Sequence, residues 1–159
     1  MLATLAAVAA VCAGGDLPPS APVEQLKPAA RCLVNRARER RDLRPLRGNA
    51  RVAPAAWAQV NDMREHDYFA HERPGWTFED RVDATDSRAP VFAEVLECGC
   101  GGLATPAAAV EALLDSREHR EILLDPLLRR MAIAVIPWMH GGGDCPDQGT
   151  WAMVLTGPA

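Results

Sequence analysis

The sequence has 159 residues, and its seventeen basic and twenty-one acidic side chains give a formal net charge of −4. A chain of this length fits one domain of about 100 to 200 residues and can bury a core without depending on disulfides. Hydrophobic residues make up 48% and charged residues 24%, as in ordinary globular proteins. The mild acidity argues against a partner that is held by net positive charge, such as nucleic acid or an anionic membrane.

An uncharged apolar run, MLATLAAVAAVCA, occupies residues 1–13. It is too short to span a membrane, which takes about 20 apolar residues, but it is typical of the hydrophobic part of a secretory signal. Small residues provide candidate cleavage points after Ala10 and Ala13. We therefore predict a secretory signal at 1–13 whose start is truncated, a linker at 14–23, and one folded domain at 24–159 that is secreted.

Two amphipathic helices are predicted in the first half of the domain. Apolar residues recur every three or four positions over 24–41, and the approach to Pro45 ends that helix. A second helix is expected over 50–65, with Pro54 in its first turns, where a missing N–H donor is tolerated. A polar, aromatic segment at 67–78 follows this helix.

The second half of the domain alternates between strand and helix patterns. A buried strand is expected at 91–96, followed by a helix at 106–116 that Thr105 caps and a second helical turn at 118–124. Two strands of a hairpin are expected at 131–138 and 150–157. This order lacks regular β-α-β alternation. The predicted fold class is therefore α+β, with helices layered against a sheet.

Four segments in order carry a family resemblance. They read CLVNRARERRDLRPLR at 32–47, DMREHDYFAHERPG at 62–75, EVLECGCGGLATPAAAVEALLDSREHREILLDP at 94–126 and MAIAVI at 131–136. Together they resemble the bacterial secreted branch of the CAP superfamily, which unites cysteine-rich secretory, antigen 5 and pathogenesis-related proteins. The resemblance implies an α-β-α sandwich with a small antiparallel sheet between helical layers.

The resemblance also implies a central cavity in which two histidines and acidic residues can bind a divalent cation. By position, His71 and His119 match the two histidines and Glu94 matches a glutamate, while Ser116 lines the cavity where many eukaryotic members have a further glutamate. Two imidazoles and a carboxylate suit zinc. Because neighbouring positions depart from the family pattern, any zinc binding is expected to be weak and optional. The interpretation that we favour over it is that the same residues form a structural hydrogen-bond network.

The function that the resemblance implies is a secreted, non-enzymatic, monomeric module that holds a lipid or small apolar ligand, without a nucleic-acid partner. A metal-dependent hydrolase and a purely structural cell-envelope protein are the alternatives. A nucleophilic pair of Ser116 and His119 is a weaker form of the hydrolase alternative, since residues three apart on a helix share a face. Trp76 and Phe78 are candidates for the floor of an apolar groove.

Five cysteines suit an oxidising compartment. Cys98 and Cys100 are too close for the Cys-x-x-Cys spacing of zinc knuckles, so disulfides are the expected use. The resemblance implies a Cys12–Cys32 pair, provided that signal cleavage precedes Cys12. Cys145 is expected to pair with Cys98 or Cys100, and we take Cys100 as its partner.

Overall fold

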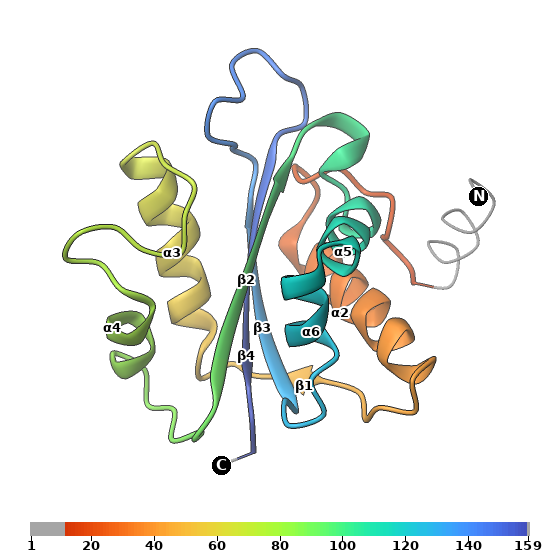
Figure 1. Cartoon of the computed structure of the whole chain (residues 1–159). Helices are drawn as coiled ribbons and strands as arrows, with labels where there is room; N and C mark the ends of the chain where they lie inside the picture. Colours follow the sequence, from red (N-terminus) through yellow and green to blue (C-terminus); the bar gives the residue numbers. More distant parts are fainter. Residues whose placement is uncertain (1–11, 159) are drawn as a thin grey trace.

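The computed structural model describes residues 12–158, so the predicted signal at 1–13 lies almost wholly outside the described part. A four-stranded sheet in the order β1-β3-β4-β2 lies between two layers of helices (Figure 1). The elements are α2 (Val23–Glu39), β1 (Arg47–Gly48), α3 (Ala53–Glu65), α4 (Phe78–Asp83), β2 (Phe92–Gly99), the 3₁₀ turn η1 (Gly101–Leu103), α5 (Pro106–Asp115), α6 (Arg117–Leu123), β3 (Arg130–Ile136) and β4 (Gly149–Thr156). The predicted α+β class and the α-β-α sandwich are confirmed.

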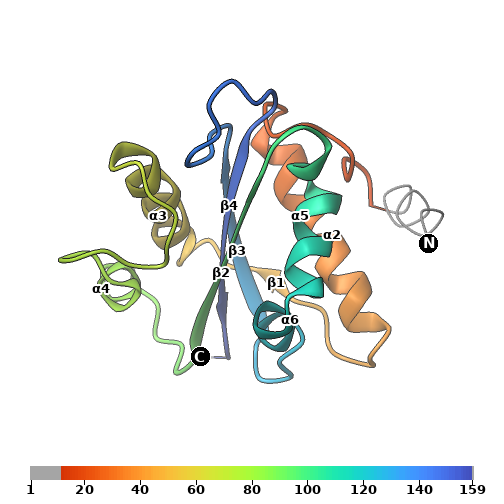
Figure 2. The ribbon, with the colours of Figure 1, turned by 45° about the horizontal axis from the view of Figure 1, so that its top comes forward.

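Helices cover both faces of the sheet. Helices α3 and α4 lie on one face, and α2, α5 and α6 lie on the other, as the two views agree (Figures 1 and 2). Because successive side chains of a strand point to opposite faces, β4 supplies both cores: Met153 packs toward α2 and α5, and Val154 packs toward α3. All eight residues of β4 are therefore buried.

The sheet is antiparallel except at one edge. Strand β4 pairs antiparallel with β2 on one side and with β3 on the other. Strand β1 has only two residues and pairs parallel with β3, which places Arg47 beside Arg130. The predicted hairpin of the last two strands is present, while β1 and α4 were not predicted.

The boundaries of α3 and β2 differ most from the predicted ones, for identifiable reasons. Helix α3 begins at Ala53 because Pro54 occupies one of its first two positions, three residues later than expected. Strand β2 continues to Gly99 because all eight of its residues pair with β4. A Cβ atom at Gly99 would lie 2.5 Å from the carbonyl oxygen of Leu103, so the chain turns tightly there only with glycine.

A buried arginine ties α2 to the loop before β3. The side chain of Arg38 donates hydrogen bonds to the carbonyl oxygens of Arg44, Leu123, Asp125 and Leu128 at 2.7–3.1 Å. Arg38 is fully buried, and this burial is the main cause that lowers the pKa of its guanidinium. Four carbonyl acceptors replace the water that this cation loses.

Two disulfides crosslink the domain, one near its N-terminal end and one between the segment after β2 and the β3–β4 loop. Cys12 pairs with Cys32 in α2, and Cys100 pairs with Cys145, with Cα–Cα distances of 5.7 and 6.1 Å. Cys98 is a half-buried free thiol. Burial, followed by the charge of Glu97, raises the pKa of the Cys98 thiol, so less reactive thiolate forms near neutral pH.

Candidate functional site

Glu94 is the centre of the candidate site. It lies on β2, the edge strand of the sheet, and follows the same side-chain alternation as Leu96, which packs toward α3. Its side chain is only 2% exposed. A buried carboxylate of this kind needs hydrogen-bond donors from the surrounding chain.

Arg81 of α4 supplies those donors. Its Nη2 atom lies 2.8 and 2.7 Å from the two carboxylate oxygens of Glu94, and its Nη1 atom donates to the carbonyl oxygen of His71 at 3.0 Å. The Arg81 side chain is fully buried, and its guanidinium carbon lies 5.4 Å from the ring centroid of Phe78. Arg81 therefore neutralises Glu94 inside the protein, a role that the sequence analysis did not assign.

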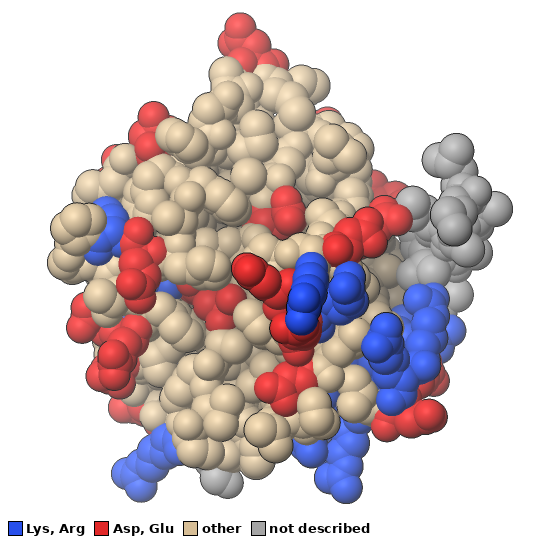
Figure 3. Space-filling model, viewed as in Figure 1, with Lys and Arg blue, Asp and Glu red and all other residues tan. Residues whose placement is uncertain are grey.

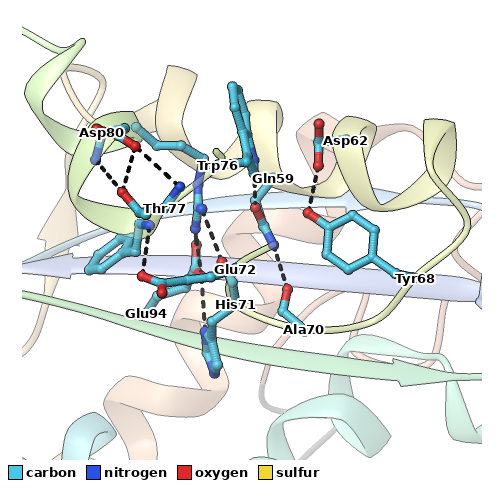
Figure 4. A network of polar contacts seen from close by, with 12 residues as sticks. Gln59, Asp62, Tyr68, Ala70, His71, Glu72, Trp76, Thr77, Asp80 and Glu94 are labelled. Carbon is cyan, nitrogen blue, oxygen red and sulfur yellow. Dashed lines mark hydrogen bonds and ion pairs between the residues drawn. The ribbon is translucent and has the colours of Figure 1, made fainter. Parts of the chain in front are cut away.

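The short helix α4 positions Arg81. Thr77 caps its first turn: the Thr77 hydroxyl accepts a hydrogen bond from the Asp80 N–H, and the Asp80 carboxylate accepts one from the Thr77 N–H (Figure 4). Such a reciprocal capping box fixes where a helix begins. A six-residue helix is too short to be stable in isolation. The cap and the buried ion pair therefore stabilise it together.

His71 reaches Glu94 from the loop after α3. Its Nδ1 atom lies 2.9 Å from Oε1 of Glu94, while its side chain is 48% exposed (Figure 4). This contact uses one ring nitrogen, and it leaves Nε2 as the atom that could meet a ligand. The structure thus brings together two of the three residues predicted as metal ligands.

His119 lies near this pair, on α6. Burial lowers the pKa of its imidazole, and the charge of His71 lowers it further, against an opposite effect of Glu118. The two imidazoles are therefore electrostatic neighbours. The Nδ1 atom of His119 is buried and has no hydrogen-bond partner among the described residues.

Ser116 lies between helices rather than within one. It ends α5 and precedes α6, with extended backbone angles of φ −73° and ψ 125°, and its side chain makes no capping hydrogen bond. The helical spacing that would align Ser116 with His119 is therefore interrupted. The hydrogen bonds of the described residues include none between these two side chains.

These residues do not fit a three-ligand metal centre. Residues 12–158 contain no cluster of three or more His, Cys, Asp or Glu side chains that could hold a metal ion. Arg81 engages both oxygens of Glu94, and its positive charge would repel a cation at that carboxylate. Catalytic zinc usually has three protein ligands, whereas His71 and His119 offer two imidazoles.

A second buried carboxylate lies beside the first site. Asp62 of α3 accepts hydrogen bonds from Nε and Nη2 of Arg73 at 2.8 and 2.6 Å. It also accepts one from the Tyr68 hydroxyl at 2.5 Å (Figure 4). The Arg73 hydrogen bonds are the main cause that lowers the pKa of Asp62. Burial and the contact with Asp62 raise the pKa of Tyr68 to about 12.

Gln59 fastens the intervening loop to α3. Its amide nitrogen donates to the Ala70 carbonyl at 2.5 Å, and its amide oxygen accepts from the Trp76 indole at 3.1 Å (Figure 4). The Trp76 ring also lies 5.9 Å from the Arg73 guanidinium carbon. Trp76 thus joins a polar network, and Phe78 lies beside Arg81.

The model of the family described as "CAP: Cysteine-rich secretory protein family" matches residues 32–152, which is most of the chain. The chain belongs to the CAP family. The recognition made from the four sequence segments is therefore confirmed. The matched range includes every residue of the candidate site.

Relatives of this CAP domain come from bacteria. It is 27% identical over 104 residues to an uncharacterized protein, YkwD, of Bacillus subtilis, covering 65% of this chain and 40% of that protein. Its structure resembles an extracellular SCP-domain protein of Bacillus anthracis, with a TM-score of 0.67 and 19% identity over 86% of this chain and 44% of that one. The CAP domain thus spans less than half of either relative.

Two further solved structures share the fold. An outer surface protein of Borrelia burgdorferi gives a TM-score of 0.66 at 16% identity, covering 79% of this chain and 87% of that one. A cysteine-rich secretory protein of Staphylococcus aureus gives 0.63 at 18% identity, covering 86% and 40%. Among residues 12–158, no helix is both long enough and apolar enough to cross a membrane.

Proposed function

We propose that this CAP domain is an extracellular binding module without hydrolytic activity. The observation that carries the proposal is the state of Glu94, whose two oxygens both accept hydrogen bonds from Arg81. Arg81 and His71 use three of the about four lone-pair sites of this carboxylate, and the paired cation makes Glu94 a weaker base and a poorer zinc ligand. Glu94 instead links β2, on which it lies, to Arg81 of α4 and to His71 of the loop after α3.

The extracellular location is supported by two features of the chain and its relatives. Cys12–Cys32 and Cys100–Cys145 are disulfides, which persist in oxidising compartments. Two of the structural relatives are described as an extracellular protein and an outer surface protein. Secretion is tested by locating the tagged full chain in culture medium and in cell fractions.

Zinc binding is part of the proposal only as a weak contact with the free nitrogens of His71 and His119. Two imidazoles without a carboxylate hold zinc far less firmly than three ligands do. We expect His71→Ala and His119→Ala each to weaken whatever zinc affinity calorimetry detects. Zinc should also leave the melting temperature almost unchanged, because a ligand near its dissociation constant adds under about 0.5 kcal/mol.

A small apolar ligand is the proposed partner of the loop that carries His71. Phe69 supports this class, because it is a large apolar side chain left 37% exposed two residues before His71. Titration with a fluorescent fatty-acid probe tests it. We expect Phe69→Ser to weaken probe binding and the control Leu103→Ser, which alters an exposed apolar residue of η1, to leave it unchanged; equal effects would reject the site.

Absence of hydrolysis is tested by a protease and esterase screen of the purified chain with and without zinc. We expect no turnover above that of a heat-denatured sample. Zinc-dependent proteolysis that Glu94→Gln abolishes while the fold stays intact would overturn the proposal and support a metal-dependent hydrolase. A matched control is Glu97→Gln, which removes a carboxylate from the same strand.

A further inference from the structure

A cavity of about 600 Å³ lies at one end of the sheet, away from the His71 site. Six of its thirteen lining residues are arginines, and none is an aspartate or a glutamate. The arginines are Arg44, Arg47, Arg51, Arg88, Arg129 and Arg130. A chain with a net charge of −4 therefore contains a cavity whose charged lining is wholly positive.

The six arginines also lack ion-pair partners. Within residues 12–158, no carboxylate lies within 4.0 Å of any of their guanidinium nitrogens, although other arginines do form such pairs, among them Arg36, Arg73 and Arg117. Their charges are thus not compensated by the protein itself. Solvent or a bound anion must balance them.

The fold, not the sequence, assembles this group. Arg47 of β1 and Arg130 of β3 are register partners in the parallel pair, and the Arg47 N–H donates to the Arg129 carbonyl at 2.9 Å. Arg88 comes from the segment before β2. Basic side chains protrude along the lower edge of the molecule in Figure 3, the edge where β1 and the C-terminus lie in Figure 1.

The backbone under the cavity is held by hydrogen bonds. The N–H of Asn49 donates to the Met131 carbonyl at 2.9 Å, and its side-chain amide donates to the Thr156 hydroxyl at 2.9 Å. Arg129 donates its N–H to the Thr156 carbonyl at 2.8 Å. Arg47 and Arg130 thus extend from anchored strands, which reduces the entropy that binding would have to overcome.

We propose that this cavity binds a small anion that carries two or more phosphate groups. The planar guanidinium fork matches phosphate oxygens in bidentate pairs, and several forks favour a ligand with several charged groups. A volume of about 600 Å³ lies within the usual range of small-molecule sites. The site is independent of the His71 region and of the function proposed for it.

Calorimetric titration of the full chain with inorganic tripolyphosphate, pyrophosphate and phosphate tests the site. We expect tripolyphosphate to bind most tightly and phosphate least, because each added group engages further guanidinium forks. The affinity should fall as ionic strength rises, since the pairs face solvent. Failure of tripolyphosphate to bind the full chain at low ionic strength would overturn the proposal.

A matched pair of double variants tests whether the cavity is the place of binding. Arg47→Gln with Arg130→Gln removes two charges from the cavity. Arg40→Gln with Arg64→Gln removes two exposed arginine charges that do not line it. We expect the first variant to weaken tripolyphosphate binding by about tenfold or more and the second by less than about twofold. Equal losses of affinity in the two double variants would show that binding depends on net charge alone, and would overturn the proposed site.

The phosphate groups can belong to a free molecule or to a lipid headgroup, and co-sedimentation with vesicles separates the two. Vesicles of phosphatidylcholine with and without cardiolipin, a lipid that carries two phosphate groups, are the probes. Sedimentation that requires cardiolipin and is reversed by tripolyphosphate assigns a headgroup, whereas tripolyphosphate binding without sedimentation assigns a free anion. Either result supports the cavity if Arg47→Gln with Arg130→Gln abolishes it.

Discussion

Two regions of this domain use arginine in opposite ways. Beside β2, Arg81 is fully buried and gives its hydrogen bonds to Glu94 and the His71 backbone. Around β1, Arg47 and Arg130 are exposed, line a cavity and have no carboxylate partner among the described residues. An arginine whose charge is matched holds the fold, whereas an unmatched group of arginines remains able to bind. In the family-matched site the arginine charge is thus paired with Glu94, whereas the charge in the cavity remains available for a ligand.

Replacing Arg81 should lower the free energy of unfolding more than any other change proposed for this domain. A small loss would contradict the contrast between the buried arginine and the cavity arginines. Arg81→Met leaves the Glu94 carboxylate buried without its cation, which typically lowers the free energy of unfolding by about 3–5 kcal/mol. Arg88→Met, in the cavity, should change it by about 0.5 kcal/mol or less, as an exposed substitution does. Urea unfolding measures both. Similar losses in the two variants would contradict the division between the regions.

The double variant Arg81→Met with Glu94→Leu separates a lost ion pair from a damaged core. It removes both charges, so most of the stability that Arg81→Met loses should return. A double variant as unstable as the single one would show that packing around Arg81, rather than its charge, stabilises α4.

Replacing Asp62 should produce the next largest effect. Asp62→Asn weakens the hydrogen bonds of a buried carboxylate with Arg73 and Tyr68, at a cost of about 2 kcal/mol in the free energy of unfolding. The folded pKa of Asp62 lies below its unfolded value of about 3.9, so its contribution is present above that pH and is lost as pH falls through the folded pKa. Unfolding curves of the wild type and the variant should therefore converge in acid.

Tyr68 provides an independent check of this network, because it is the one tyrosine in the sequence. Its pKa of about 12 should be visible in an ultraviolet absorbance titration and should move toward 10 in Asp62→Asn. An unshifted tyrosine in the wild type would mean that Tyr68 does not contact Asp62 in solution.

Removing cavity arginines should have a smaller effect of opposite sign. The double change Arg47→Gln and Arg130→Gln relieves repulsion between like charges, so we expect a slight rise in melting temperature at low ionic strength that disappears in high salt. Thermal melts at two salt concentrations measure it. A clear fall in melting temperature would show that these side chains also hold the fold.

The smallest expected effect concerns the pH response of His119. Its folded pKa is lowered below about 6.5, so the unfolded chain takes up a proton before the folded one does and stability falls as pH drops below about 6.5. An NMR titration of the His119 ring should give the lower pKa, and His71→Gln should raise it in part. An unchanged His119 pKa in His71→Gln would show that the two histidines do not interact electrostatically.

The sequence was informative wherever structure depends on neighbours along the chain. Apolar spacing and proline positions predicted the long helices and the final hairpin, because a helix face or a strand alternation is visible in a few residues. The two-residue β1 and the six-residue α4 are too short for such a period, and tertiary contacts define them.

The roles of charged residues could not be read in the same way. His71 and Glu94 were singled out by family position, and the structure places them in contact, but nothing in the sequence links Arg81 to a carboxylate thirteen residues away. The cavity arginines are spread from position 44 to position 130, and a net charge of −4 conceals them. Only the strand order brings them together.

We propose that the partner of the Glu94 carboxylate is the Arg81 guanidinium and not a metal ion. A crystal of the full chain soaked in zinc, with anomalous data collected at the zinc edge, tests this most directly. We predict that both oxygens of Glu94 stay bonded to Arg81, with zinc density confined to the imidazole nitrogens or absent from the site. A zinc ion about 2.0–2.2 Å from a Glu94 oxygen, with Arg81 displaced, would contradict the account.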